Sequence, residues 1–86
     1  MNPNIIGNRI KSIMIIEDIK RSYLAKKMNI SYNTLTKKLN GEREFTLNEI
    51  LKMKIILDLD METCANLFFN KENFVYKEKR LLKNEA

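Results

Sequence analysis

The apolar residues of this sequence recur three or four positions apart along most of its length. This spacing places side chains on one face of an α-helix, whereas a half-buried strand requires strict alternation. Only two Gly and one Pro are present, so β-hairpins and long irregular loops are disfavoured. The sequence therefore predicts an all-α fold of short helices joined by short connections.

The length of 86 residues allows one domain with a single modest core, and the apolar fraction of 44% argues against wholesale disorder. The single Cys64 cannot form an intramolecular disulfide, and without any His no zinc cluster is expected. We expect Cys64 to lie in the core as a small hydrophobe. The sequence lacks an apolar run of about 18 residues and a signal-peptide pattern. We therefore expect a soluble, cytoplasmic protein with no membrane partner, metal or cofactor.

Three helices are expected in the first half of the chain, at about Ile6–Glu17, Arg21–Met28 and Tyr32–Asn40. Between the second and third, Asn29 tolerates the left-handed backbone that ends many helices, and Ser31 is a suitable N-cap. Two short helices separated by three residues cross more readily than they lie antiparallel. This is the spacing of a helix-turn-helix.

Two further helices are indicated by their N-terminal residues. Thr46 followed three positions later by Glu49 predicts a capping box, and we expect both residues to act in capping alone. Asp60 is suited to cap a fifth helix. The expected domain spans residues 1–69, and residues 70–86 form a tail that is a frayed end, a dimerisation arm or an extra helix.

The charge is unevenly distributed along the chain. Sixteen Lys and Arg against eleven Asp and Glu give a formal net charge of +5. Between Lys20 and Gly41 there are six basic residues and no acid, whereas Glu42 to Asn70 holds six acids and three bases. A polyanion would therefore bind one preferred stretch of the chain, although a merely solvated basic face is the alternative.

The segment RSYLAKKMNISYNTLTKKLNGEREFTL, residues 21–47, resembles the Cro/C1-type (XRE-like) helix-turn-helix repressors of phages and bacteria. The matching features are LA in the expected second helix, NG after the third and FTL at the start of the fourth. The resemblance covers about residues 6–69 and implies a five-helix, lambda-repressor-like helix-turn-helix domain with a short C-terminal extension. Three positions depart from the family pattern, which frequently has Gly at Asn29, Gln at Arg21 and an apolar residue at Lys38.

A small side chain is required where the second and third helices cross, and Ala25 provides it. We expect Leu24, Ile30 and Leu35 to form a buried wedge that fixes this crossing. With the wedge buried, and at about 100° per residue, five polar residues of the third helix fall within an outward arc of about 140°. They are Tyr32, Asn33, Thr36, Lys37 and Asn40.

This arc holds no carboxylate and suits the major groove of DNA, whose edges offer donors, acceptors and thymine methyl groups. Asn33 can bridge adenine bidentately, and Lys37 can reach guanine or a phosphate. The methyl group of Thr36 and the ring of Tyr32 can contact thymine. We therefore assign base reading to these four residues, against the alternative of a solvated polar surface.

Phosphate contacts are expected around the third helix. In the resembled family, the DNA backbone is contacted by the first residue of the second helix and by the loop after the third helix. Helix N-termini add backbone amide donors. The corresponding and neighbouring residues here are Lys20, Arg21, Ser31, Thr34, Lys38, Asn40, Gly41 and Arg43.

These features favour a sequence-specific DNA-binding transcriptional regulator, of the repressor type found in phages and mobile elements. We expect a homodimer on an operator, joined through the fourth and fifth helices and the tail, where NLFF and FVY supply surplus apolar groups. Without His, a Gly-rich phosphate loop or a metal-ligand cluster, we expect no enzymatic activity and no small-molecule effector. The alternative is a protein-interaction module on the same scaffold, such as an antirepressor or an anti-CRISPR-type inhibitor.

Overall fold

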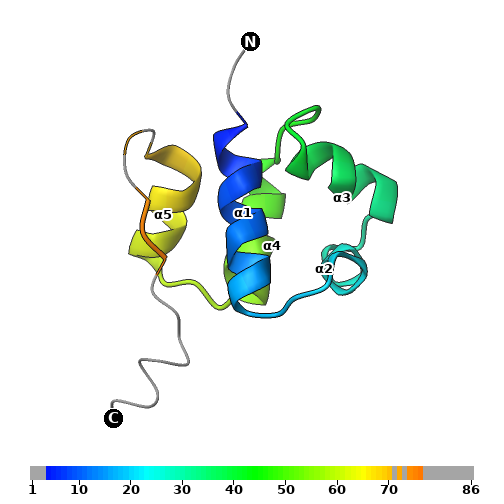
Figure 1. Cartoon of the computed structure of the whole chain (residues 1–86), viewed down its shortest axis with the longest axis horizontal. Helices are drawn as coiled ribbons and strands as arrows, with labels where there is room; N and C mark the ends of the chain where they lie inside the picture. Colours follow the sequence, from blue (N-terminus) through cyan, green and yellow to red (C-terminus); the bar gives the residue numbers. More distant parts are fainter. Residues whose placement is uncertain (1–3, 71, 73, 77–86) are drawn as a thin grey trace.

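The computed structural model describes residues 4–70, 72 and 74–76 (Figure 1). This part of the chain holds five α-helices and no strand, which confirms the all-α prediction. The helices are α1 (Ile5–Ile16), α2 (Arg21–Met28), α3 (Tyr32–Leu39), α4 (Leu47–Ile56) and α5 (Met61–Phe69). The first three begin and end within one residue of the bounds predicted from the sequence.

The helices are arranged around α1 (Figure 1). In this view α1 lies in the middle with α4 behind it, α5 lies on one side, and α2 and α3 lie on the other. Helix α1 packs against α3 and α5, α2 packs against α3 and α4, and α4 also contacts α5. Helix α3 is therefore supported from the inner side by two helices and lies at the edge of the molecule.

The core is continuous across all five helices. A fully buried Leu, Ile or Met side chain stabilises the fold by about 1.5–3 kcal/mol relative to an exposed one. The predicted wedge is confirmed: Leu24, Ala25 and Leu35 are buried, and Ile30 is half-buried against them. The predicted core position of Cys64 is confirmed as well. The side chains with no exposed surface are Ile10, Ile13, Leu24, Met28, Leu35, Leu39, Met53 and Leu67.

One kind of helix ending recurs and explains how the chain turns with so few glycines. After α1, α2 and α4, an Asp or Asn adopts positive φ; these residues are Asp18 (56°), Asn29 (59°) and Asp58 (53°). The apolar residue that follows each one donates its N–H to the carbonyl five positions back, as in a Schellman motif. Its side chain then packs onto the core; these residues are Ile19, Ile30 and Leu59.

The helix beginnings follow the predicted capping residues. At α4 the Thr46 hydroxyl accepts from the Glu49 N–H at 3.2 Å, and the Glu49 carboxylate accepts from the Thr46 N–H at 2.8 Å. This is the reciprocal capping box, as predicted. The Asp60 carboxylate likewise accepts from the Thr63 N–H at 2.6 Å and caps α5. Local sequence signals therefore fix where these helices start.

The described part of the tail folds back onto the domain. Phe74 and Tyr76 are half-buried against the core, and the Tyr76 hydroxyl donates to the Glu17 carboxylate at 2.6 Å. The Arg9 guanidinium lies 5.2 Å from the centre of the Phe74 ring. Two of the three residues of FVY thus pack against the core of the same chain, and of the three only Val75 is largely exposed. This corrects the expectation that FVY supplies surplus apolar groups for a dimer interface.

The predicted extra helix or arm falls largely on residues 71, 73 and 77–86, outside the described part of the chain. None of the helices within the described residues has the length and hydropathy that a bilayer span requires.

Candidate nucleic-acid interface

Helix α3 begins and ends at residues suited to these positions. The Ser31 hydroxyl accepts from the Thr34 N–H at 3.0 Å, so Ser31 is the N-cap that the sequence predicted. Gly41 follows the helix with φ of 81°, a conformation that favours glycine. On the inner side Leu35 and Leu39 have no exposed surface. These contacts fix which side of α3 is left for solvent.

The side chains predicted to read bases lie on that outer side. Tyr32, Asn33 and Lys37 are exposed, with 53% of the Tyr32 surface accessible, and Thr36 is half-buried. The arrangement on which the prediction depends is therefore present in the fold.

The C-terminal end of α3 is held by the beginning of the chain. The Asn4 side-chain amide donates to the Leu39 carbonyl at 2.5 Å, which satisfies one of the carbonyls that a helix end leaves unpaired. A Cβ at Gly7 would collide with the same Leu39 carbonyl, so only glycine permits this approach of α1. Lys11 donates to the Asn40 side-chain oxygen at 2.9 Å. Sequence reasoning missed these residues, although a glycine inside a helix is a recognised signal of close packing.

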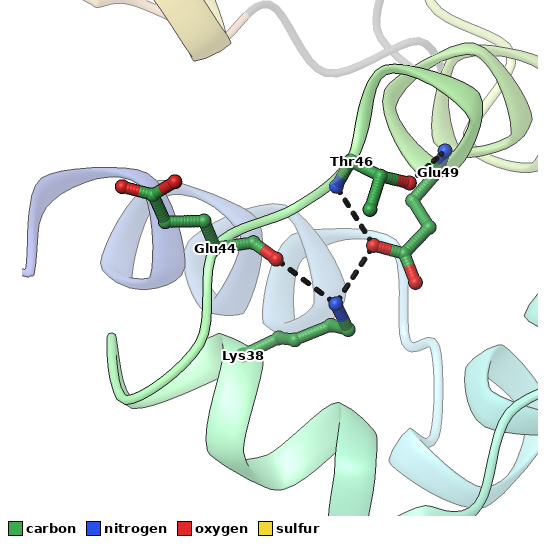
Figure 2. Close-up of polar contacts among 4 residues, drawn as sticks. All are labelled: Lys38, Glu44, Thr46 and Glu49. Atoms are coloured by element: carbon green, nitrogen blue, oxygen red, sulfur yellow. Dashed lines mark hydrogen bonds and ion pairs between the residues drawn. The ribbon is translucent and has the colours of Figure 1, made fainter.

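Lys38 does not lie where the sequence reasoning placed it. Its ammonium donates to the Glu49 carboxylate at 2.8 Å and to the Glu44 carbonyl at 2.9 Å (Figure 2). Only 7% of the Lys38 side chain and 14% of the Glu49 side chain are exposed. The ammonium is thus occupied inside the fold, and the phosphate contact predicted for Lys38 is corrected: its stem fills the position that is often apolar in the resembled family.

Glu49 consequently has two roles, whereas capping alone was predicted. One carboxylate oxygen accepts from both Lys38 and the Thr46 N–H, and so joins α3 to the N-terminus of α4 (Figure 2). Burial by itself would raise the pKa of Glu49. The hydrogen bonds from Lys38 and from the Thr46 backbone and hydroxyl, with the charge of Lys38, outweigh that effect and lower the pKa below its ordinary value.

The remaining residues predicted to contact phosphate lie before α2 and at the two ends of α3. Lys20 precedes α2, Ser31 and Thr34 lie at the N-terminus of α3, and the others follow α3 at Asn40, Gly41 and Arg43. All are exposed except Thr34, which is half-buried and receives a 2.8 Å hydrogen bond from the Ser31 hydroxyl. The exposed residues among them are accessible to a DNA backbone that passes the start of α2 and the two ends of α3.

Among the residues predicted to contact phosphate, Arg21 turns toward the side chains that were predicted to read bases. Its Nη1 donates to the Thr36 hydroxyl at 3.2 Å, and its guanidinium carbon lies 5.8 Å from the centre of the Tyr32 ring. The outer face of α3 therefore presents amide, hydroxyl, phenol, ammonium and guanidinium groups. It offers hydrogen-bond donors, acceptors and positive charge to a bound molecule, with no carboxylate among them.

The fold and this surface define a small all-helical protein with a basic, carboxylate-free helix at its edge. Residues 10–71 match the model of a family of proteins of unknown function, DUF739, and the chain belongs to that family. No curated protein and no solved structure matches the sequence.

Proposed function

We propose that this protein is a sequence-specific DNA-binding regulator of transcription, with the lambda-repressor-like helix-turn-helix fold of Cro/C1-type repressors. The observation that carries the proposal is the outer face of α3, where Tyr32, Asn33 and Lys37 are exposed beside a half-buried Thr36. No acid lies between Lys20 and Gly41, so nothing in α2 or α3 repels a phosphate backbone. Helix α3 lies in the major groove in this proposal.

The two kinds of contact have different tasks. The base-reading residues discriminate sequences: Asn33 pairs with adenine, while Lys37 contacts guanine or phosphate. The phosphate residues outside this face, such as Lys20 before α2 and Arg43 after α3, set the register without reading sequence. Because α3 is capped at Ser31 and anchored at Leu39, its backbone is held in position before DNA binds.

A second copy of the chain completes the proposed operator complex. One short reading helix contacts only a few base pairs, and two copies related by symmetry read half-sites about 34 Å apart. Leu47, Leu51 and Ile55 follow one another at four-residue spacing along α4 and are all exposed, and Phe69 at the end of α5 is exposed too. This apolar surface supports dimerisation through α4 and α5. Light scattering at high concentration tests it, and a clean monomer argues against the dimer.

The DNA proposal is tested by selection from a pool of random duplex DNA, followed by titrations at several salt concentrations. Specific binding enriches one motif, and the logarithm of affinity falls with the logarithm of salt by about 0.9 per phosphate contacted. Asn33→Ala should lose about 1–3 kcal/mol at one base pair only. Arg43→Ala, the matched control, should weaken all sequences alike and reduce the salt slope by about 1.

The second candidate function is a protein-interaction module on the same scaffold, acting as an antirepressor or an inhibitor of a nucleic-acid enzyme. The exposed apolar stripe of Leu47, Leu51 and Ile55 favours it, because such a patch is typical of protein interfaces. The random DNA pool separates the two functions. Enrichment of a motif supports the regulator, whereas the interaction module predicts no motif and no salt-dependent binding.

A further inference from the structure

Arg21 belongs to α2 by sequence, but its functional group lies on α3. It is the first residue of α2 and is half-buried. Its Nη1 donates to the Thr36 hydroxyl at 3.2 Å, and its guanidinium carbon lies 5.8 Å from the centre of the Tyr32 ring. Tyr32 and Thr36 stand one turn apart on the outer side of α3. Two contacts from successive turns therefore hold the guanidinium against the face that is proposed to read bases.

These contacts orient the guanidinium without neutralising it. A guanidinium carries five N–H donors, and Thr36 takes one of them. No residue from Lys20 to Gly41 is acidic, and within residues 4–70, 72 and 74–76 the structure gives Arg21 no carboxylate partner. Contact with an exposed Tyr ring stabilises a cation only weakly. The group is thus positioned, charged and supplied with unused donors.

We propose that Arg21 determines specificity by reading guanine, rather than only contacting phosphate as the sequence resemblance implied. The proposal rests on the DNA-binding function proposed above. With Nη1 bonded to Thr36, the edge formed by Nε and Nη2 still offers two parallel donors. Two such donors match the O6 and N7 acceptors of guanine in the major groove, which is the commonest specific contact of arginine with DNA.

The location of the guanidinium favours a base over a phosphate. The N-terminal residues of a reading helix face the base edges, and Tyr32, one of the two residues that hold Arg21, is the first residue of α3. Lys20, the neighbouring cation, is exposed, and within the described chain it has no hydrogen bond to α3. Lys20 is therefore suited to the backbone contact at this end of α2, and Arg21 is directed to the groove.

The test repeats the selection from random duplex DNA with three variants. Arg21→Lys keeps the charge but loses the paired donors, Arg21→Ala removes both, and Lys20→Ala is the matched control with one cation fewer. Wild-type protein should enrich a motif that contains an invariant guanine. Arg21→Lys and Arg21→Ala should lose the preference for that guanine, about 5- to 150-fold, while the rest of the motif is retained. Lys20→Ala should keep the whole motif and bind every sequence more weakly.

A second measurement uses the selected duplex with deazaguanine, which lacks the N7 acceptor, at the position in question. Wild-type protein should bind it more weakly than the guanine duplex, and Arg21→Ala should bind both equally. If Arg21→Lys and Arg21→Ala retain the full motif, Arg21 contacts phosphate alone and the inference is overturned while the DNA-binding function stands. If wild-type protein enriches no motif, the proposed function fails and the inference fails with it. Circular dichroism of each variant establishes that the helices are intact.

Discussion

The buried ion pair between Lys38 and Glu49 predicts that the two partners respond very differently to substitution. Lys38→Met keeps the apolar stem and removes only the ammonium. The Glu49 carboxylate then still accepts the Thr46 N–H and is 14% exposed, and the Glu44 carbonyl belongs to an exposed residue that water reaches. Little is left unsatisfied, so we expect the free energy of unfolding to fall by only about 0–1 kcal/mol.

Removal of the acid is expected to be far more costly. Glu49→Ala leaves the Lys38 ammonium, on a side chain that is 7% exposed, with the Glu44 carbonyl as its only remaining acceptor among the described residues. The substitution also breaks the capping box of α4. Loss of one partner of a buried pair costs about 3–5 kcal/mol, and the partial exposure of Glu49 places the expected value near 3 kcal/mol. Glu49→Gln keeps an acceptor and a capping box, so it should lose about 1–2 kcal/mol.

A double-mutant cycle measures this coupling. Urea unfolding is followed by circular dichroism for the wild type, Lys38→Met, Glu49→Ala and the double variant. In the Lys38→Met background no buried ammonium remains, and Glu49→Ala should then lose only the cap, about 0.5–1 kcal/mol. If Glu49→Ala loses the same free energy in both backgrounds, the ion pair contributes nothing and the reasoning is refuted.

The same pair has a definite pH dependence. Because the folded-state pKa of Glu49 is lowered, its contribution is fully present above the unfolded-state pKa of about 4.3 and is lost as the pH falls through the lower folded value. Below that value Lys38 lies buried beside a neutral acid. Lys38→Met should therefore gain stability relative to wild type as the pH falls from neutral through the folded-state pKa of Glu49.

Three further outcomes are expected from unfolding and reactivity measurements. Gly7→Ala should lower the free energy of unfolding by about 2 kcal/mol or more, because its methyl collides with the Leu39 carbonyl, and an unchanged urea midpoint would contradict this packing. Asn29→Ala should lose about 1 kcal/mol through its left-handed conformation, whereas Asn29→Gly should be at least as stable as wild type in the same assay. Burial raises the pKa of the Cys64 thiol, although the charge of Lys54 opposes it, so a disulfide reagent should modify the native protein slowly and the urea-unfolded protein at once. Rapid modification of the native protein would place Cys64 at an accessible position.

The helices were predictable from the sequence because their signals are local. A capping box, an Asp or Ser at an N-cap and a three-or-four spacing of apolar residues each act within a few positions of the chain. Thr46, Ser31 and Asp60 all cap the helices they were expected to cap. The wedge around Ala25 followed from the same spacing, since the two helices it joins are separated by three residues.

Some contacts could not be predicted from the spacing of apolar residues. They join residues that are far apart in the sequence. Lys38 meets Glu49 eleven positions on, Arg21 meets Thr36 fifteen positions on, and Asn4 meets Leu39 thirty-five positions on. A sequence alone shows Lys38 as one more cation on a basic helix, because only the packed fold turns its stem inward. The charge count shows the basic stretch of the sequence, but it does not show that the ammonium of Lys38 is buried in the fold.

The anchoring of α3 by the first residues of the chain has a consequence for recognition. Asn4 and Lys11 hold the last turn of α3 and the residue after it, while Ser31 holds the first turn. A helix that is already immobilised at both ends loses little conformational entropy when it binds. A smaller part of the favourable contact energy is then offset by the ordering of the helix. Under the proposed function, affinity for every operator is thus adjustable from the first dozen residues. Substitutions at Asn4 or Lys11 would change how firmly α3 is held, and so the affinity for DNA, without changing which bases α3 prefers.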